Sequence, residues 1–228
     1  MPDVLPRIEV PADAGGVDAR IDHAQWPEKL IEALNGLAAR AGELAEALLQ
    51  DLDVAAAPEL MRQRRIGRNE LAAIQVALAY TDAQQEYYAA NPDRQRVRHY
   101  AMRGLSSPGK RDGLYWPALP GEVESPLGAA FADARPGMAY HGYLYRVLTA
   151  QGKDAPGGAK SYLRDGLMTE GYALIAWPER WGDTGVMSFI VSRDGVVYQK
   201  NLGPGTAAAA ARIGSYNPDA GWTPVQDR

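Results

Sequence analysis

The sequence predicts an α+β fold in which long N-terminal helices pack on an antiparallel β-meander. The front of the chain is rich in alanine and carries apolar residues at helical spacing. The back is rich in turn formers, and all 12 tyrosines lie at Tyr80 or later. Its short apolar runs are joined by connections too short for parallel crossovers. We expect a helical region over residues 1–61 and an α+β domain with an antiparallel sheet over residues 62–228.

Helical spacing dominates the first 100 residues or so. Apolar residues at steps of three or four predict an amphipathic helix over residues 24–51. Pro58 suits the first turn of a second helix. Asn69 suits the N-cap of a third helix, which should end near Pro92, because a residue before proline avoids helical backbone.

The third helix should pack one stripe of its surface against the sheet. That stripe comprises Leu71, Ile74, Leu78 and Thr81. A shorter helix is expected over residues 95–103, and residues 104–126, rich in proline, glycine and serine, should form a loop.

The back half predicts strands. Residues 140–149 alternate in polarity, and residues 172–177 and 186–191 are short apolar runs bounded by turn formers. The Asp-Gly pair at 194–195, between two apolar runs, is the strongest hairpin signal in the chain. A run of alanines favours a last helix over residues 206–213.

Composition excludes several classes of protein. Hydrophobic residues make up 46% and charged residues 23% of the chain, which excludes disorder for most of it. The net charge of −4 argues against nucleic acid as a partner. The absence of cysteine excludes thiol nucleophiles, disulfides and zinc–thiolate sites. No apolar run reaches the ~20 residues of a membrane helix, and we expect no cofactor.

The densest group of reactive side chains lies in the loop. Ser106 or Ser107 with a desolvated Lys110, and with His141, gives a nucleophile and a base. Alternatively the segment is a rigid turn, in which the hydroxyls bond its own backbone and Lys110 pairs with Asp112. As a turn it is either a ligand site or a clamp between the helices and the sheet. The candidate binding residues are Ser106, Ser107, Lys110, Arg111, Asp112, Tyr115, Trp116 and His141.

Three further groups of side chains could carry a function: a set of arginines, a set of aromatic residues and the histidines. The arginines Arg62, Arg64, Arg65 and Arg68 either grip an anion or form a solvated helix face. The aromatic residues Trp116, Trp177, Trp181, Tyr115, Tyr140 and Tyr143 either form a platform for a sugar or peptide or fill the core. The histidines, His23, His99 and His141, fall on different predicted elements, so we expect no metal site.

Several strings in one order resemble a known family. They include RRIGRNEL at 64–71, SSPGKRDGLYWP at 106–117, HGYLY at 141–145 and VYQKNLG at 197–203. Over residues 62–226 or so the sequence resembles the bacterial domain of unknown function 2950 family. The resemblance implies a periplasmic or extracellular protein and brings no established catalytic residue. No signal peptide is visible at the N-terminus, so export implies a leader ahead of this sequence.

The order of elements is also similar to the soluble part of type IV pilins and pseudopilins, in which one long helix precedes an antiparallel meander. These likenesses favour an exported, non-catalytic, pilin-like module that binds or assembles with an envelope protein or glycan. An envelope hydrolase built on Ser106 or Ser107 with Lys110 is one alternative. A glycan-binding module that uses the tryptophans is another.

Overall fold

A computed structural model describes residues 57–118, 120–128 and 137–226, together with residues 36, 39–41 and 43. These five residues are helical, and the rest of the helix predicted over residues 24–51 lies outside the described residues. The chain divides after Ala55, and the unit Ala56–Arg228 holds every element discussed below. The predicted boundary between residues 61 and 62 stays a prediction.

Helix α2 (Ala57–Ala90) is one helix of 34 residues, where two were predicted. Asn69 does not cap a helix: its side-chain amide donates to the carbonyl oxygen of Thr184 at 2.8 Å. Good helix formers on both sides of it keep the backbone helical. The helix ends where the sequence predicts, just before Asn91, which takes a φ of 48° ahead of Pro92.

The back half forms a five-stranded antiparallel sheet in the order β1-β6-β7-β8-β9. Its strands are β1 (Tyr143–Leu148), β6 (Ala173–Pro178), β7 (Met187–Ser192), β8 (Tyr198–Asn201) and β9 (Thr223–Pro224). The predicted α+β class and the antiparallel sheet are confirmed. Two small hairpins between β1 and β6 were not predicted: β2 (Ala150–Gln151) with β3 (Lys160–Ser161), and β4 (Leu163–Arg164) with β5 (Leu167–Met168).

The predicted hairpin joins β7 to β8. Gly195 has a φ of 73°, and its N–H donates to the carbonyl oxygen of Ser192 at 3.0 Å. The carboxylate of Asp194 accepts the Ser192 hydroxyl at 3.0 Å. Glycine is needed here because a side chain is strained at positive φ.

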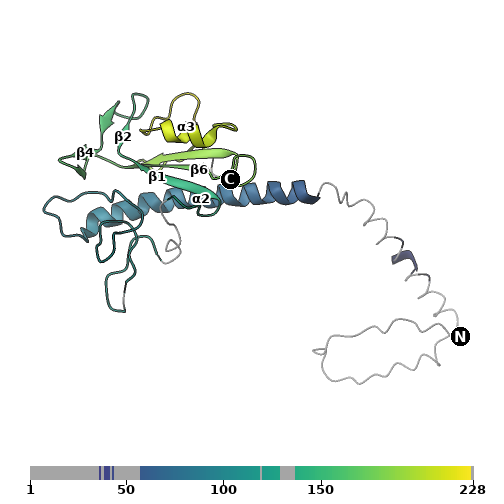
Figure 1. Ribbon diagram of the computed structural model, residues 1–228, viewed down its shortest axis with the longest axis horizontal. Helices are drawn as coiled ribbons and strands as arrows, with labels where there is room; N and C mark the ends of the chain where they lie inside the picture. Colours follow the sequence, from purple (N-terminus) through teal and green to yellow (C-terminus); the bar gives the residue numbers. More distant parts are fainter. Residues whose placement is uncertain are drawn as a thin grey trace, which may run out of the picture. The chain divides into compact units, whose positions relative to one another are not determined.

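Helix α2 and helix α3 (Thr206–Arg212) cover opposite faces of the sheet (Figure 1). Of the predicted stripe, Thr81 is buried and Ile74 and Leu78 are partly buried against the core, but Leu71 is wrong, because it is 65% exposed. The buried residues of α2 are Ala73, Ala77, Tyr80, Thr81, Ala83, Gln84 and Tyr87. Alanines on this side allow the helix to lie close to the strands.

The helix predicted over residues 95–103 does not form. The N–H of Tyr100 donates to the carbonyl oxygen of Met168 at 2.8 Å, so this stretch runs beside β5. The side chain of Gln84 accepts the N–H of Ala101 and donates to its carbonyl oxygen, both at 2.8 Å. These long-range hydrogen bonds replace the local ones of a helix.

Candidate binding site

The loop that carries most of the predicted site residues is closed by its own backbone. Leu105 and Tyr115 form a bridge, and the N–H of Ser106 donates to the carbonyl oxygen of Tyr115 at 2.8 Å. Gly113 lies so close to the opposite side that an added Cβ would be 2.7 Å from the carbonyl carbon of Leu105. The loop is therefore a narrow, ordered lobe. The phenol of Tyr87 donates to the carbonyl oxygen of Arg111 at 2.9 Å and ties the lobe to α2.

The two serines bond within this lobe. The N–H and the hydroxyl of Ser107 donate to the carboxylate of Asp112 at 2.7 and 2.9 Å, and the hydroxyl of Ser106 bonds the backbone of Gly113. Burial opposes ionisation of Asp112, but the hydrogen bonds from Ser107 and the charge of Arg103 hold its pKa below the usual value.

Lys110 does not join this arrangement. Its backbone N–H donates to the carbonyl oxygen of Ser107 at 2.9 Å, and its residue is exposed. Asp112 has Arg103 as its cationic neighbour, at 3.9 Å, rather than Lys110. Among the described residues no hydrogen bond joins the Lys110 ammonium to a serine hydroxyl, so the pairing that a serine–lysine hydrolase needs is not assembled.

The aromatic end of the lobe is anchored, as a turn or a clamp requires. Trp116 is 5% exposed, and its indole N–H donates to the carbonyl oxygen of Val123 at 3.1 Å. The guanidinium of Arg111 lies 5.7 Å from the centre of the Trp116 ring and 3.6 Å from the carboxylate of Glu122. Tyr115 is half-buried beside it.

Of the two interpretations of the aromatic residues, the burial of the rings favours the core over the platform. Trp116 and Tyr143 are buried, and Trp177 lies under the guanidinium of Arg146 at 5.7 Å. Trp181 is 37% exposed and donates to the side chain of Asn201 at 2.9 Å. Rings that are buried or covered offer no face to a sugar, so most of this set acts as core.

The histidines are also apart. His141 is exposed in the turn before β1, with its ring 4.2 Å from that of Tyr140. His99 is buried and its Nε2 lies 2.8 Å from the carboxylate of Asp93. His23 lies outside the described residues. In the described part of the chain no group of three or more His, Asp or Glu side chains could hold a metal ion.

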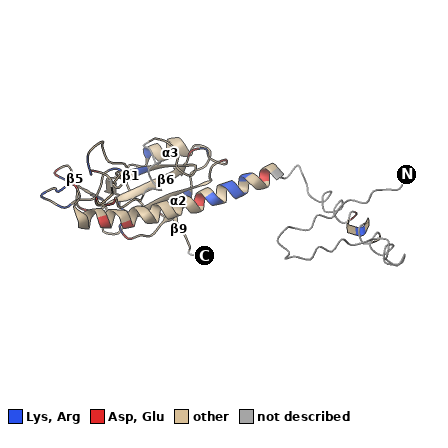
Figure 2. Cartoon of the chain, turned by 90° about the horizontal axis from the view of Figure 1, so that it is seen from below, with Lys and Arg blue, Asp and Glu red and all other residues tan. Residues whose placement is uncertain are grey.

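The four arginines lie on the N-terminal part of α2 (Figure 2). Arg62 donates to the carbonyl oxygen of Gly182, and Arg65 bonds Asp183, so these two fix the β6–β7 loop to the helix. Arg64 and Arg68 are exposed, as on a solvated helix face.

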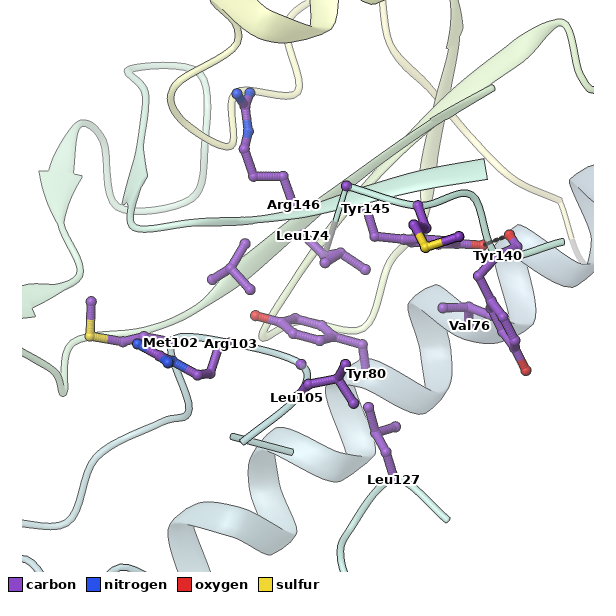
Figure 3. A pocket seen from close by; sticks show the side chains of 14 residues that line it. Val76, Tyr80, Met102, Arg103, Leu105, Leu127, Tyr140, Tyr145, Arg146 and Leu174 are labelled. Carbon is purple, nitrogen blue, oxygen red and sulfur yellow. Dashed lines mark hydrogen bonds between the residues drawn. The ribbon is translucent and has the colours of Figure 1, made fainter. Parts of the chain in front are cut away.

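A cavity of about 230 Å³ lies beside the lobe, between α2, β1, β6 and the chain that leads into the lobe. Tyr80 lies across it, with Met102 at one end and Tyr140 and Tyr145 at the other (Figure 3). Apolar side chains complete its walls: Val76, Leu105, Leu127, Met138, Val147 and Leu174. Arg146 contributes only its base, because its guanidinium reaches away to the carbonyl oxygens of α3.

The hydroxyls inside this apolar pocket are neutral and partly engaged. Tyr80 donates to the carbonyl oxygen of Ala173 at 3.2 Å and accepts an N–H of Gln84 at 2.9 Å. Tyr145 points its hydroxyl at the carbonyl oxygen of Tyr140, 3.4 Å away. Burial raises the pKa of both phenols, so neither ionises near neutral pH. Arg103 also lines the pocket, and its guanidinium donates to the hydroxyl of Ser107 at 2.8 Å.

The sequence did not indicate this pocket. It borders the predicted loop through Gly104 and Leu105, but its walls come from segments far apart in the chain. The alternation that puts Tyr145 and Val147 on one side of a strand was a usable signal. Nothing in the sequence pairs them with Met102.

Comparison with known proteins gives one result. The family model of proteins of unknown function DUF2950 matches residues 48–225. No curated protein and no solved structure matches the chain, so the likeness to pilin domains stays a prediction. Within the described residues no helix has the length and apolar character needed to cross a membrane.

Proposed function

Because the chain belongs to the DUF2950 family, whose function is unknown, we propose a function from the pocket: this protein is a non-catalytic binding module that seats one apolar side chain of a protein partner. The observation that carries the proposal is a mainly apolar cavity beside an ordered loop, whose two lining arginines, Arg103 and Arg146, are held by Ser107 and by α3. Loops held on a rigid scaffold are common places for binding residues.

The size of the pocket favours a side chain over a free metabolite. Pockets for small molecules span roughly 300–1,000 Å³, whereas this cavity has about 230 Å³. One aliphatic or aromatic side chain fills such a space, and buried apolar anchors of this kind supply much of the affinity in protein interfaces.

The chemistry of the walls points the same way. Tyrosine and methionine are enriched at protein interfaces. Five residues of these two types line the pocket: Tyr80, Tyr140, Tyr145, Met102 and Met138. The two methionines are 42% and 60% exposed, so the rim is itself apolar. Met side chains adapt to partners of different shape. A charged side chain in the pocket would lose its hydration, and the two lining arginines are already bonded to Ser107 and to α3.

The test is selection of random short peptides on the whole chain, followed by binding to two matched variants. Val76→Trp places an indole in the pocket, while Gln75→Trp adds the same group to the exposed neighbouring position on α2. We expect selected peptides to share an apolar residue, to lose about tenfold or more in affinity for Val76→Trp, and to bind Gln75→Trp normally.

Peptides that bind both tryptophan variants equally, or a selection that yields no binder, would refute the proposal. Thermal melting of both variants shows whether the fold is retained. If Val76→Trp unfolds, Val147→Phe fills the same pocket from the strand.

The proposal extends to location. The family resemblance implies an exported envelope protein, and a chain without cysteine suits an oxidising compartment. A fusion of the complete natural gene product to a reporter enzyme that needs disulfides should be active, and an inactive fusion that is stably expressed would refute export alone.

A further inference from the structure

Among the strands that the structure describes, β1 is an edge strand, because β6 is its one neighbour in the sheet order. In an antiparallel pair the residues alternate, so that every second one points its N–H and C=O away from its partner. Gly142 and Glu179 form a hydrogen-bonded pair, since the N–H of Glu179 donates to the carbonyl oxygen of Gly142 at 3.0 Å. With the register Tyr145↔Ala176, the even residues of β1 face β6 and the odd ones face outward.

Two of the outward residues already have partners. Tyr143 exchanges both backbone hydrogen bonds with Tyr140, at 2.8 and 3.1 Å. Farther along, the carbonyl oxygen of Thr149 accepts the N–H of Tyr162 at 2.8 Å. Between them lie Tyr145 and Val147, and no hydrogen bond reaches their N–H or C=O groups from the part of the chain that the structure describes.

The open edge and the pocket coincide. The side chains of Tyr145 and Val147 both line the pocket, on the α2 side of the sheet. In an antiparallel pair, directly opposite residues place their side chains on the same face. A strand bound to this edge would therefore point the residue opposite Tyr145 or Val147 toward the pocket.

We infer that the partner binds as an extended segment that adds a strand to β1, forms backbone hydrogen bonds with Tyr145 and Val147, and inserts an apolar side chain into the pocket. This inference rests on the proposed function and specifies the form of the partner. Strand addition combines backbone hydrogen bonds for affinity with pockets for alternate side chains. The open edge comprises only two described residues with outward backbone groups, Tyr145 and Val147, so the partner's side chain that enters the pocket determines which segment binds.

A second copy of this chain fits the edge poorly. Antiparallel self-pairing that joins Tyr145 to Val147 of the other copy sets Arg146 opposite Arg146 on the α3 face. Like charges directly opposite each other destabilise a sheet. Each guanidinium is also held in place by the carbonyl oxygens of Ala210 and Ile213, at 2.7 and 2.6 Å. A foreign segment carries no such conflict.

Amide hydrogen exchange of the free chain tests the open edge. The amides of Tyr145 and Val147 should exchange at least about tenfold faster than those of Leu144 and Arg146, and a bound peptide should slow them. If Tyr145 and Val147 are already protected in the free chain, another segment occupies the edge and the inference is wrong.

Backbone methylation of the selected peptides tests the hydrogen bonds without altering the protein. N-methyl groups at alternate positions should reduce affinity about tenfold, while those between them should have little effect. On the protein, Val147→Pro removes only an outward N–H, which an edge strand tolerates. It should bind at least about tenfold more weakly than Val147→Ala, which keeps that N–H.

The outcomes separate the two proposals. Peptides that need their apolar residue and respond to Val76→Trp, yet tolerate methylation at every position, would overturn strand addition and leave the binding module intact. If no peptide responds to Val76→Trp, the proposed function fails, and strand addition fails with it. A concentration-dependent dimer that Val147→Pro abolishes would make a second copy the occupant and overturn the foreign segment.

Discussion

Replacing Gln84 with leucine should destabilise the protein far more than the loss of one side chain on a helix suggests. Gln84 is fully buried, and its amide holds the chain at Ala101, which is buried as well. It accepts the Ala101 N–H at 2.8 Å, donates to the Ala101 carbonyl oxygen at 2.8 Å, and donates to the phenol of Tyr80 at 2.9 Å.

The magnitude follows from the groups that would lose their partners. Leucine fills a similar volume, so packing changes little, but the N–H and C=O of Ala101 lose this partner in a buried place. Each buried polar group left unsatisfied costs about 1–3 kcal/mol. We therefore expect the free energy of unfolding to fall by about 2–5 kcal/mol.

Urea unfolding followed by tryptophan fluorescence measures this change. Gln85→Leu is the control, because Gln85 is exposed on the next position of α2 and its side chain donates to the Tyr172 phenol at 2.9 Å. The control should change the free energy of unfolding by less than about 1 kcal/mol. A change of less than about 1 kcal/mol in Gln84→Leu as well would refute the reasoning.

Three further predictions concern the helix, the hairpin and the loop. In urea unfolding, Ile74→Ala should lower the free energy of unfolding by about 1–2 kcal/mol, less than the 2–5 kcal/mol of a fully buried site. Leu71→Ala, at a 65% exposed position, should change it by no more than about 0.5 kcal/mol. Equal losses would mean that the wrong face of the helix was identified. Gly195→Val should lower the melting temperature, because φ is 73° at that position. Gly214→Val, where φ is not positive, is the control. Equal melting temperatures of the two variants would contradict the turn geometry. Since the pKa of Asp112 is lowered in the folded state, its ionised form stabilises the protein above the unfolded pKa of about 3.9, and this contribution is lost as the pH falls below that value. Unfolding measured from pH 6 to pH 3 or so should therefore show a smaller acid-induced loss for Asp112→Asn than for the natural chain, and identical slopes would contradict this role.

The sequence predicted the elements whose conformation depends mainly on residues close to one another in the chain. The first four strands of the sheet, the turn at Gly195 and helix α3 follow from alternation, from glycine and from alanine, which act within a few residues. The last strand, β9, was not predicted. The end of α2 follows from Pro92 for the same reason.

The errors arose where the conformation or packing of a segment depends on residues that are distant in the sequence. Between Tyr80 and Tyr87 and before them, the buried side of α2 carries alanines and Gln84, which have weak apolar character, so the more apolar Leu71 was wrongly included in the stripe. The stretch from residue 95 to 103 has helical composition, but its backbone bonds Met168 and Gln84 instead. The pocket needs six segments at once, at residues 76–80, 102–105, 127, 137–140, 145–147 and 174, and no local pattern relates them.

The attachment of α2 to the β6–β7 loop has a consequence for how the protein is made. Asn69 bonds Thr184, and Glu70 accepts the N–H groups of Val186 and Met187, across 115 to 117 residues of sequence. At about 5–20 residues per second, a ribosome takes roughly 6–23 s to make that stretch. During this interval the sheet side of α2 has no sheet to cover it. Three of the seven buried residues on that side are alanines, Ala73, Ala77 and Ala83, which present little apolar area to other nascent chains. The small side chains that obscured the packing face in the sequence therefore also reduce the surface open to aggregation while the strands are still being synthesised.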